Sequence, residues 1–307
     1  MTSERLKGVL APVVTPFTSD FCINIDAWIR HCEWLLAQNA GLAVFGTNSE
    51  ANSLSIHEKR KSLDALIDAG VPTDRLLPGT GCCAIPETVE LTRHAMEVDA
   101  AGVLMLPPFY YKNVSDDGVF ASFAEVIEQV ADDKLKVYLY HIPQLSRTPI
   151  SYAVIERLLQ RYPSTVAGIK DSSGDWNNTL GMLEAFQPQG FDVFCGSEKY
   201  LLQTLRYGGA GCISATANVN PGSIARLYRT WRDDDAMDQQ QALNVIREAF
   251  EKHPMIPALK AALAHCAGDD GWRAVRPPLV SLDATRSSDL VQDLKNHKLN
   301  MPGLVAA

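Results

Sequence analysis

The sequence of 307 residues has few of the features that mark membrane, extracellular or nucleic-acid-binding proteins. It has no apolar run of about 18 residues, the length that a membrane-spanning helix needs. It has no run of more than three lysine or arginine residues, and its formal net charge is −8. Because binding to nucleic acid or to acidic lipid usually needs a basic patch, we expect neither a nucleic-acid partner nor a membrane partner.

Cysteine is sparse and lacks the spacing of a disulfide framework or a metal site. The seven cysteines are an odd number and form no C-x-x-C pair, which favours a reducing compartment. The apolar stretch near the N-terminus is short and is interrupted by Pro12 and Pro16, unlike a signal peptide. The seven histidines show no ligand spacing such as H-E-x-x-H. We therefore expect a cytoplasmic protein without a bound metal.

Short apolar runs rich in Val, Ile and Leu alternate with longer amphipathic stretches. The runs are 8–17, 42–46, 75–81, 102–108, 136–143, 166–172, 191–197 and 211–218. Such alternation predicts parallel strands joined by helices. The first run ends in Thr15-Pro16-Phe17, without the glycine-rich loop of a doubly wound dinucleotide-binding sheet. Eight units therefore predict an α/β protein with a (β/α)8 TIM barrel.

The helical stretches have recognisable starts, and the last part of the chain has no strand pattern. Ser55 precedes Glu58 by three residues, which predicts a capping box at a helix start. After Trp231, the segments 235–252, 254–267 and 284–298 are helical in pattern. We predict that residues 1–232 form the barrel and that 233–307 form a three-helix C-terminal extension packed on it.

The strand ends are where the chemistry of such a barrel is expected, because its active site lies at their carboxyl side. Lys170 is the first candidate, since it lies in an otherwise apolar strand. Desolvation disfavours a charged amine and frees it to attack a carbonyl. The alternative is a lysine that extends from the strand end to water.

Tyr140 and Thr47 are the next candidates. Tyr138 and Tyr140 lie on the same face of their strand, and a tyrosine at a barrel mouth can move protons. Plain core packing with a satisfied hydroxyl explains the same tyrosine. Thr47 follows Gly46, where backbone N–H groups and a hydroxyl can hold a carboxylate. Ordinary turn chemistry is the alternative there.

Nine short segments, in order along nearly the whole chain, form a familiar set. They are Thr15-Pro16-Phe17, Gly46-Thr47-Asn48-Ser49-Glu50, Gly79-Thr80-Gly81, Pro108-Phe109-Tyr110-Tyr111, Tyr140-His141-Ile142-Pro143, Gly168-Ile169-Lys170-Asp171, Gly196-Ser197-Glu198, Gly211-Cys212-Ile213-Ser214 and Arg276-Pro277-Pro278-Leu279. Together they resemble the dihydrodipicolinate synthase / N-acetylneuraminate lyase family of pyruvate-dependent, Schiff-base class I aldolases.

The resemblance implies roles for the strand-end residues. Lys170 matches the Schiff-base lysine, and Tyr140 matches the general acid/base beside it. Thr47 and Asn48 match the cradle for the pyruvate carboxylate, and Thr47 also links tyrosines in a proton relay. No metal or organic cofactor is implied beyond the covalent imine on Lys170.

Further residues follow from the same resemblance. Tyr111 matches a relay tyrosine that is donated across a subunit interface, which implies a homodimer or homotetramer. Ile213 matches a residue whose backbone lines the pocket. Glu198 follows the run 191–197 and Ser214 lies in the run 211–218, both within matched segments, so we include both as substrate-binding candidates.

The sequence departs from the lysine-pathway synthases at the second-substrate site. Those synthases usually carry Gly-Thr-Thr-Gly-Glu in this loop, and here Asn48 and Ser49 replace its second threonine and its second glycine. Those synthases also have an arginine that is expected to hold a substrate carboxylate, and Arg147 comes about two residues later than that position. Arg147 can therefore either reach the pocket or lie on the surface. The 4-hydroxy-tetrahydrodipicolinate synthase activity therefore stays an alternative.

The departures favour a different substrate. Glu198-Lys199 replaces the Asp-Glu pair of sialic acid lyases, which disfavours N-acetylneuraminate lyase activity. The segment Asp171–Gly174 is common among relatives that act on 2-keto-3-deoxy sugar acids and other hydroxy-oxo acids. We therefore expect an aldolase or lyase acting on such an acid.

Two further hypotheses come from other features. The altered loop 46–50 is compatible with a non-catalytic binder of 2-oxo acids on the same scaffold. The glycine-rich segment Tyr207–Gly211 lies where barrels often bind phosphate, although a helix C-cap explains it as well.

Overall fold

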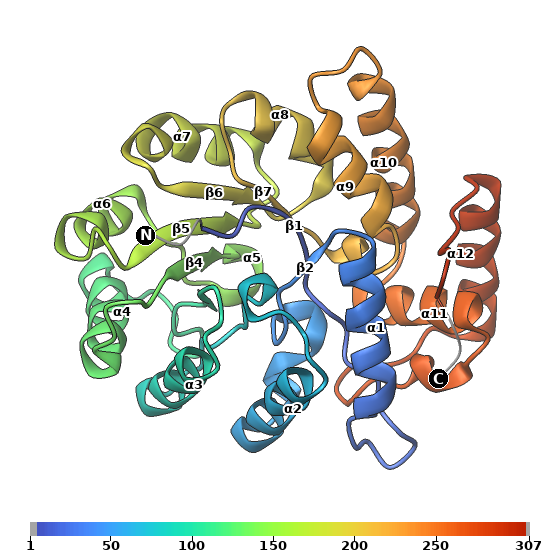
Figure 1. Ribbon diagram of the computed structural model, residues 1–307, viewed down its shortest axis with the longest axis horizontal. Helices are drawn as coiled ribbons and strands as arrows, with labels where there is room; N and C mark the ends of the chain where they lie inside the picture. Colours follow the sequence, from blue (N-terminus) through green and yellow to red (C-terminus); the bar gives the residue numbers. More distant parts are fainter. Residues whose placement is uncertain (1–4, 305–307) are drawn as a thin grey trace. The chain divides into compact units, whose positions relative to one another are not determined.

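Strands alternate with helices along most of the computed structural model, which describes residues 5–304 (Figure 1). The strands are β1 Gly8–Ala11, β2 Gly41–Leu42, β3 Val103–Met105, β4 Val137–His141, β5 Val166–Asp171, β6 Asp192–Cys195 and β7 Gly211–Ile213. The helices are α1 Ile25–Ala37, α2 Ile56–Asp68, α3 Ile85–Glu97, α4 Asp116–Val130, α5 Pro143–Ser146, α6 Tyr152–Arg161, α7 Trp176–Phe186, α8 Leu201–Arg206, α9 Pro221–Thr230, α10 Ala236–Glu251, α11 Met255–Ala267 and α12 Ala284–Asn296. The predicted parallel α/β class is confirmed.

Two compact units make up the chain. The first consists of Pro72–Cys212 with residues 5–7, and the second consists of Gly8–Val71 with residues 213–304. The predicted division between residues 232 and 233 stays a prediction.

Parallel strands form the centre of the first unit, in the order β3-β4-β5-β6, and Gly211 and Cys212 of β7 lie next to β6. Their side chains are buried throughout, as expected for a sheet covered on both faces. Gly168 allows the close approach of β5 to β6, since a Cβ there would lie 2.3 Å from the carbonyl oxygen of Asp192. Arg5 ties the N-terminal segment to these strands by pairing with Asp192 at 3.1 Å.

Seven of the eight predicted runs contain a strand, and the run 75–81 does not. There, Gly79 makes a single parallel bridge to Leu104. The Leu104 N–H donates to the Pro78 carbonyl at 2.9 Å, and the Thr80 N–H donates to the Leu104 carbonyl at 3.1 Å. Pro78 has no N–H to extend the ladder, so a full strand at this run was a wrong expectation.

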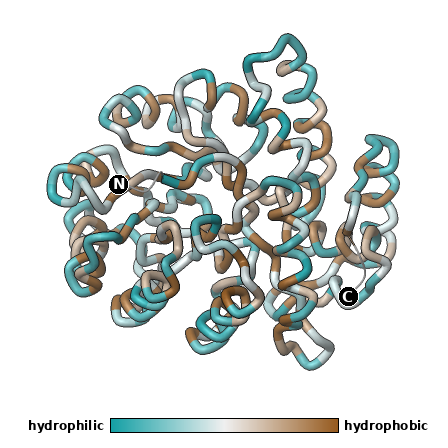
Figure 2. The backbone as a smooth tube through the Cα atoms, viewed as in Figure 1, coloured by the Kyte–Doolittle hydropathy of each residue, from teal (hydrophilic) through white to brown (hydrophobic). Residues whose placement is uncertain are grey.

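The second unit contains the parallel pair β1 and β2 and the helices α1, α2 and α9–α12. The predicted capping box is confirmed, because Ser55 accepts from the Glu58 N–H and Glu58 accepts from the Ser55 N–H. Helices α10, α11 and α12 lie where the three C-terminal helices were expected. Hydrophobic and hydrophilic residues alternate along the helices of Figure 2, as in helices that bury one face. Within residues 5–304, no helix has the length and apolar character to cross a membrane.

Candidate active site

Lys170 and Tyr140 form a buried pair in the first unit. They occupy paired positions on the neighbouring strands β5 and β4. Their residues are 2% and 3% exposed. The Lys170 Nζ atom lies 4.2 Å from the centroid of the Tyr140 ring. The structure therefore brings together an amine and a phenol away from bulk water.

Glu198 lies in the same electrostatic environment as Lys170. Glu198 is 1% exposed and begins the turn after β6. Hydrogen bonding with Cys195, burial and the Glu198 carboxylate raise the pKa of the Cys212 thiol, while Lys170 acts in the opposite direction. Lys170 and Glu198 are thus both close enough to influence one buried thiol. Since that thiol stays protonated, Cys212 is unsuited to act as a nucleophile.

Asp171 holds the chain directly after Lys170. Its Oδ1 atom accepts from the Ser173 N–H at 2.9 Å. Its Oδ2 atom accepts from Asn178 Nδ2 at 3.1 Å and from Thr179 Oγ1 at 2.6 Å. A carboxylate with this many donors is a rigid anchor, so the end of β5 is fixed at the residue that follows the lysine.

Tyr111 and Arg147 lie on exposed segments that contact each other. Tyr111 is 73% exposed, and its ring packs edge-on against Tyr110 at 5.4 Å. Arg147 is exposed and ends α5 in the left-handed region with φ of 55°. Lys112 Nζ donates to the Ser146 carbonyl at 3.3 Å, which holds the tyrosine loop next to the turn of Arg147. Neither residue is part of the buried pair.

Thr47 and Asn48 lie in a tight 3-10 turn of the second unit, Thr47–Ser49. Both are partly exposed. The Gly46 N–H donates to Ser49 Oγ at 3.2 Å, and Thr15 Oγ1 donates to the Ser49 carbonyl at 2.7 Å. The buried Ser49 therefore shapes the turn, and leaves Thr47 and Asn48 at its partly open side.

Ile213 and Ser214 are fully buried in the second unit. The Ser214 N–H donates to the Leu10 carbonyl at 3.3 Å, and the Ser214 hydroxyl accepts from Arg247 Nη1 at 3.3 Å. The predicted substrate-binding hydroxyl thus has an arginine partner within its own unit.

Glu50, the last residue of the predicted loop, forms a buried ion pair that sequence reasoning missed. Both Glu50 and Lys260 have side chains that are 0% exposed, and Lys260 Nζ binds Glu50 Oε1. The same Nζ donates to the Ala274 carbonyl at 2.6 Å. The Arg276 N–H donates to Glu50 Oε2 at 2.9 Å. Burial lowers the pKa of Lys260 to about 8, although the Glu50 carboxylate opposes that shift.

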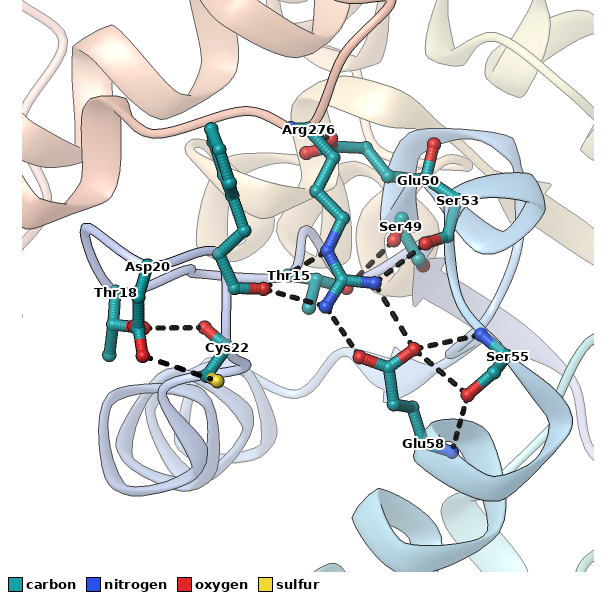
Figure 3. Close-up of polar contacts among 11 residues, drawn as sticks. Thr15, Thr18, Asp20, Cys22, Ser49, Glu50, Ser53, Ser55, Glu58 and Arg276 are labelled. Carbon is teal, nitrogen blue, oxygen red and sulfur yellow. Dashed lines mark hydrogen bonds and ion pairs between the residues drawn. The ribbon is translucent and has the colours of Figure 1, made fainter.

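Arg276 extends this network to three segments of the second unit (Figure 3). Its guanidinium donates to the Ser53 carbonyl and to the Phe21 carbonyl, each at 2.6 Å. It also pairs with Glu58 at the start of α2. The hydrogen bonds from Arg276 hold the pKa of Glu58 at about 2. The charged side chains thereby fasten the Thr47–Glu50 turn to the C-terminal part of the unit.

Two other features concern the glycine-rich segment after α8 and the arrangement of residues that could bind a metal. Tyr207 caps the end of α8, and the Gly209 N–H donates to the Thr204 carbonyl at 2.8 Å. The glycine-rich segment 207–211 therefore forms the C-terminal turn of α8 that leads into β7. No group of three or more His, Cys, Asp or Glu side chains within residues 5–304 is arranged to hold a metal ion.

Comparisons with known proteins place these features in a family context. The profile of the dihydrodipicolinate synthetase family matches residues 5–297. The 4-hydroxy-tetrahydrodipicolinate synthase of Methanococcoides burtonii is 31% identical over 297 residues, which cover 94% of this chain and 97% of that protein. The crystal structure of dihydrodipicolinate synthase from Agrobacterium tumefaciens has a TM-score of 0.88 and 29% identity, and the match covers 95% of this chain and 99% of that one.

A third similar protein is YagE of Escherichia coli K12, described as a putative 2-dehydro-3-deoxy-D-gluconate aldolase. It is 31% identical over 309 residues, covering 97% of this chain and 99% of that protein. Its crystal structure in complex with pyruvate has a TM-score of 0.86, covering 96% of this chain and 99% of that one.

Proposed function

This chain belongs to the dihydrodipicolinate synthetase family and is a lyase, and we propose that it is a pyruvate-dependent class I aldolase acting through a Schiff base on Lys170. The proposed substrate is a 2-keto-3-deoxy sugar acid or a related hydroxy-oxo acid. One observation supports this most strongly: the Lys170 amine is buried with its Nζ atom 4.2 Å from the Tyr140 ring centroid.

The reaction begins with attack of the neutral Lys170 amine on C2 of the 2-oxo acid. The C–N bond forms, and the ketone oxygen takes a proton to give a carbinolamine. A second proton on that oxygen lets it leave as water, and a protonated imine remains. Tyr140 is the proposed donor and acceptor of these protons, because a positioned phenol can act as a general acid and base.

The imine then withdraws electrons from the carbon chain. When the C4 hydroxyl loses its proton, the C3–C4 bond breaks, an aldehyde leaves, and the electron pair moves through C3 toward the imine nitrogen. Protonation of the resulting enamine at C3 and hydrolysis of the imine release pyruvate and regenerate the Lys170 amine. No redox equivalent is consumed in this sequence.

The remaining residues have proposed binding roles. Thr47 and Asn48 would hold the carboxylate of the 2-oxo acid through the turn that contains them, and the backbone of Ile213 would line the pocket. Arg147, Glu198 and Ser214 are the proposed contacts to the rest of the substrate.

The finer architecture belongs to the same proposal. We infer a closed (β/α)8 barrel with a C-terminal helical extension, supported by similarity to the Agrobacterium structure at a TM-score of 0.88. We further infer a homodimer or homotetramer in which Tyr111 completes the proton relay of a neighbouring subunit. The exposure of Tyr111, at 73% of its surface, supports a role at an interface.

The second candidate is 4-hydroxy-tetrahydrodipicolinate synthase, in which the enamine of pyruvate attacks aspartate semialdehyde. The relative from Methanococcoides burtonii, described by that activity, favours it. The Asn48-Ser49 pair and the displaced Arg147 disfavour it, because they change the turn and the cation expected for the second substrate.

A substrate panel read by pyruvate release or consumption tests these proposals. Wild-type enzyme and the Lys170→Ala variant should be compared on 2-keto-3-deoxygluconate, N-acetylneuraminate, and pyruvate with aspartate semialdehyde. The aldolase proposal predicts Lys170-dependent pyruvate release from the keto-deoxy acid. Turnover of aspartate semialdehyde alone would replace it with the synthase activity, and binding without any turnover would indicate a non-catalytic binder.

A further inference from the structure

A cavity of about 600 Å³ lies entirely within the second unit. It is lined by α1, α9, α10 and the segment that follows α12. None of the residues proposed for the imine chemistry lines it. Its volume is within the range of cavities that hold small-molecule ligands, so its charge and polar groups indicate what it can bind.

The lining carries positive charge, although the whole chain has a formal net charge of −8. Four basic side chains face the cavity, and none of the residues that line it is Asp or Glu. The basic residues are Arg226, Arg229, His297 and Lys298. Arg226 pairs with Asp235 at 2.8 Å. Within residues 5–304, no ion pair engages Arg229 or Lys298. Uncompensated cations around a hollow favour an anionic ligand.

The amino end of α9 opens into the same cavity. Asn220, Gly222 and Ser223 line the cavity, and no side chain caps this ten-residue helix. Helix N-termini attract anions through their free N–H groups and the helix dipole. The end of α9 therefore adds N–H donors to the cationic side chains.

Asn220 adds an unpartnered polar side chain to the same end of the cavity. It is 9% exposed. Its backbone N–H donates to the Thr216 carbonyl at 2.8 Å, and its carbonyl accepts from the Ile224 N–H at 3.3 Å. Its side-chain amide has no hydrogen-bond partner within residues 5–304. The fixed backbone keeps this amide at the cavity, where it can hydrogen-bond to a bound ligand.

Apolar side chains complete the lining, among them Trp34, Leu243, Ile246 and Leu299. We propose that this cavity binds a small organic anion, with its phosphate or carboxylate group at the amino end of α9 near Asn220 and Arg229. The carbon skeleton of the ligand packs on the apolar side chains. This site is separate in its residues from the Lys170 chemistry and does not depend on it.

Calorimetric titration of the full-length protein at constant ionic strength tests the proposal. Inorganic phosphate and succinate serve as separate probes. The probe that binds more tightly shows whether the site prefers a phosphate or a carboxylate group. The variants are Arg229→Gln, which changes an exposed side chain, and Asn220→Ala. The matched control is Arg232→Gln, because the Arg232 guanidinium stacks on Trp231 at 3.9 Å and does not line the cavity.

We expect at least one probe to bind the wild type, with a dissociation constant of about 1 mM or tighter. Arg229→Gln should weaken that binding roughly tenfold, as loss of a charge-assisted hydrogen bond does. Arg232→Gln should change it less than about twofold. Absence of binding by both probes would overturn the proposal, and so would equal binding by wild type and Arg229→Gln. If Asn220→Ala strongly lowers the melting temperature, its binding data are set aside. The test then depends on Arg229→Gln, which changes an exposed side chain.

Discussion

Tyr140 and Lys170 are paired across the neighbouring strands β4 and β5, and the lysine amine lies 4.2 Å from the centroid of the tyrosine ring. If the phenol transfers protons for the lysine, Tyr140→Phe should reduce kcat by about 100-fold and change KM little. Steady-state pyruvate release measures both constants.

Tyr138→Phe is the matched control, because Tyr138 lies on the same strand and its hydroxyl is 3.5 Å from Asp192. Its turnover should stay close to wild type. Equal losses in both variants would mean that Tyr140 matters for packing rather than for proton transfer.

The proposed sharing of Tyr111 between subunits predicts complementation. Lys170→Ala and Tyr111→Ala should each be almost inactive, and a refolded equimolar mixture should regain about a quarter of wild-type activity, because half of the subunit pairs are mixed and each has one intact site. Tyr110→Ala is the matched control, because Tyr110 is equally exposed at 73%. It replaces Tyr111→Ala in a parallel set of measurements. If the mixture stays inactive, or if ultracentrifugation finds a monomer, Tyr111 does not cross an interface.

The buried Glu50–Lys260 pair predicts a large stability effect. Lys260→Met leaves a carboxylate buried without its cation, which should lower the free energy of unfolding by about 3–5 kcal/mol. The double variant Glu50→Gln/Lys260→Met should regain much of this loss, because no buried charge remains unpaired. Urea unfolding measures both.

Lys252→Met is the control for that experiment. Lys252 pairs with Asp293 at 2.6 Å, but its side chain is 60% exposed, so its loss should cost less than about 1 kcal/mol. A Lys260→Met penalty as small as that of Lys252→Met would contradict the inferred importance of the buried pair.

The Arg276–Glu58 pair predicts a dependence of stability on acid. The pKa of Glu58 is about 2 in the folded protein, below its usual 4.5, mainly because of hydrogen bonds from Arg276. The folded state therefore binds the Glu58 proton less readily, so the pair stabilises above pH 4.5 and loses its effect as pH falls toward 2. The difference between wild type and Glu58→Gln should be about 1 kcal/mol at neutral pH, allowing for solvent screening.

Denaturant unfolding at several pH values checks this window. Glu87→Gln is the control, since Glu87 occupies the corresponding first-turn position of α3 and is exposed. A wild-type advantage over Glu58→Gln that persists unchanged at the acid end would show that the carboxylate is not responsible.

Local pattern was enough to predict the fold class and to place Lys170 and Tyr140 in strands, whereas their pairing was an expectation from the family resemblance. Strand alternation placed both residues at the ends of parallel strands, and neighbouring parallel strands bring such ends together. The same reasoning failed at 75–81, because Pro78 interrupts hydrogen bonding in a segment that is otherwise apolar enough for a strand.

The Glu50–Lys260 pair was beyond local pattern, since 210 positions separate the two residues along the chain. A lysine within the otherwise apolar segment of α11 was the only signal, and it did not name a partner. The loop 46–50 was recognised for Thr47 and Asn48, whereas the contacts that hold it came from α11 and from Arg276.

Borohydride trapping followed by peptide mass spectrometry tests the proposed imine most directly. Wild-type protein treated with pyruvate and then with borohydride should carry a stable reduced adduct on the peptide that contains Lys170, and Lys170→Ala should carry none. Folded wild-type protein that leaves Lys170 unmodified, or an equal adduct on Lys136, the partly exposed lysine just before β4, would contradict imine formation with pyruvate at Lys170.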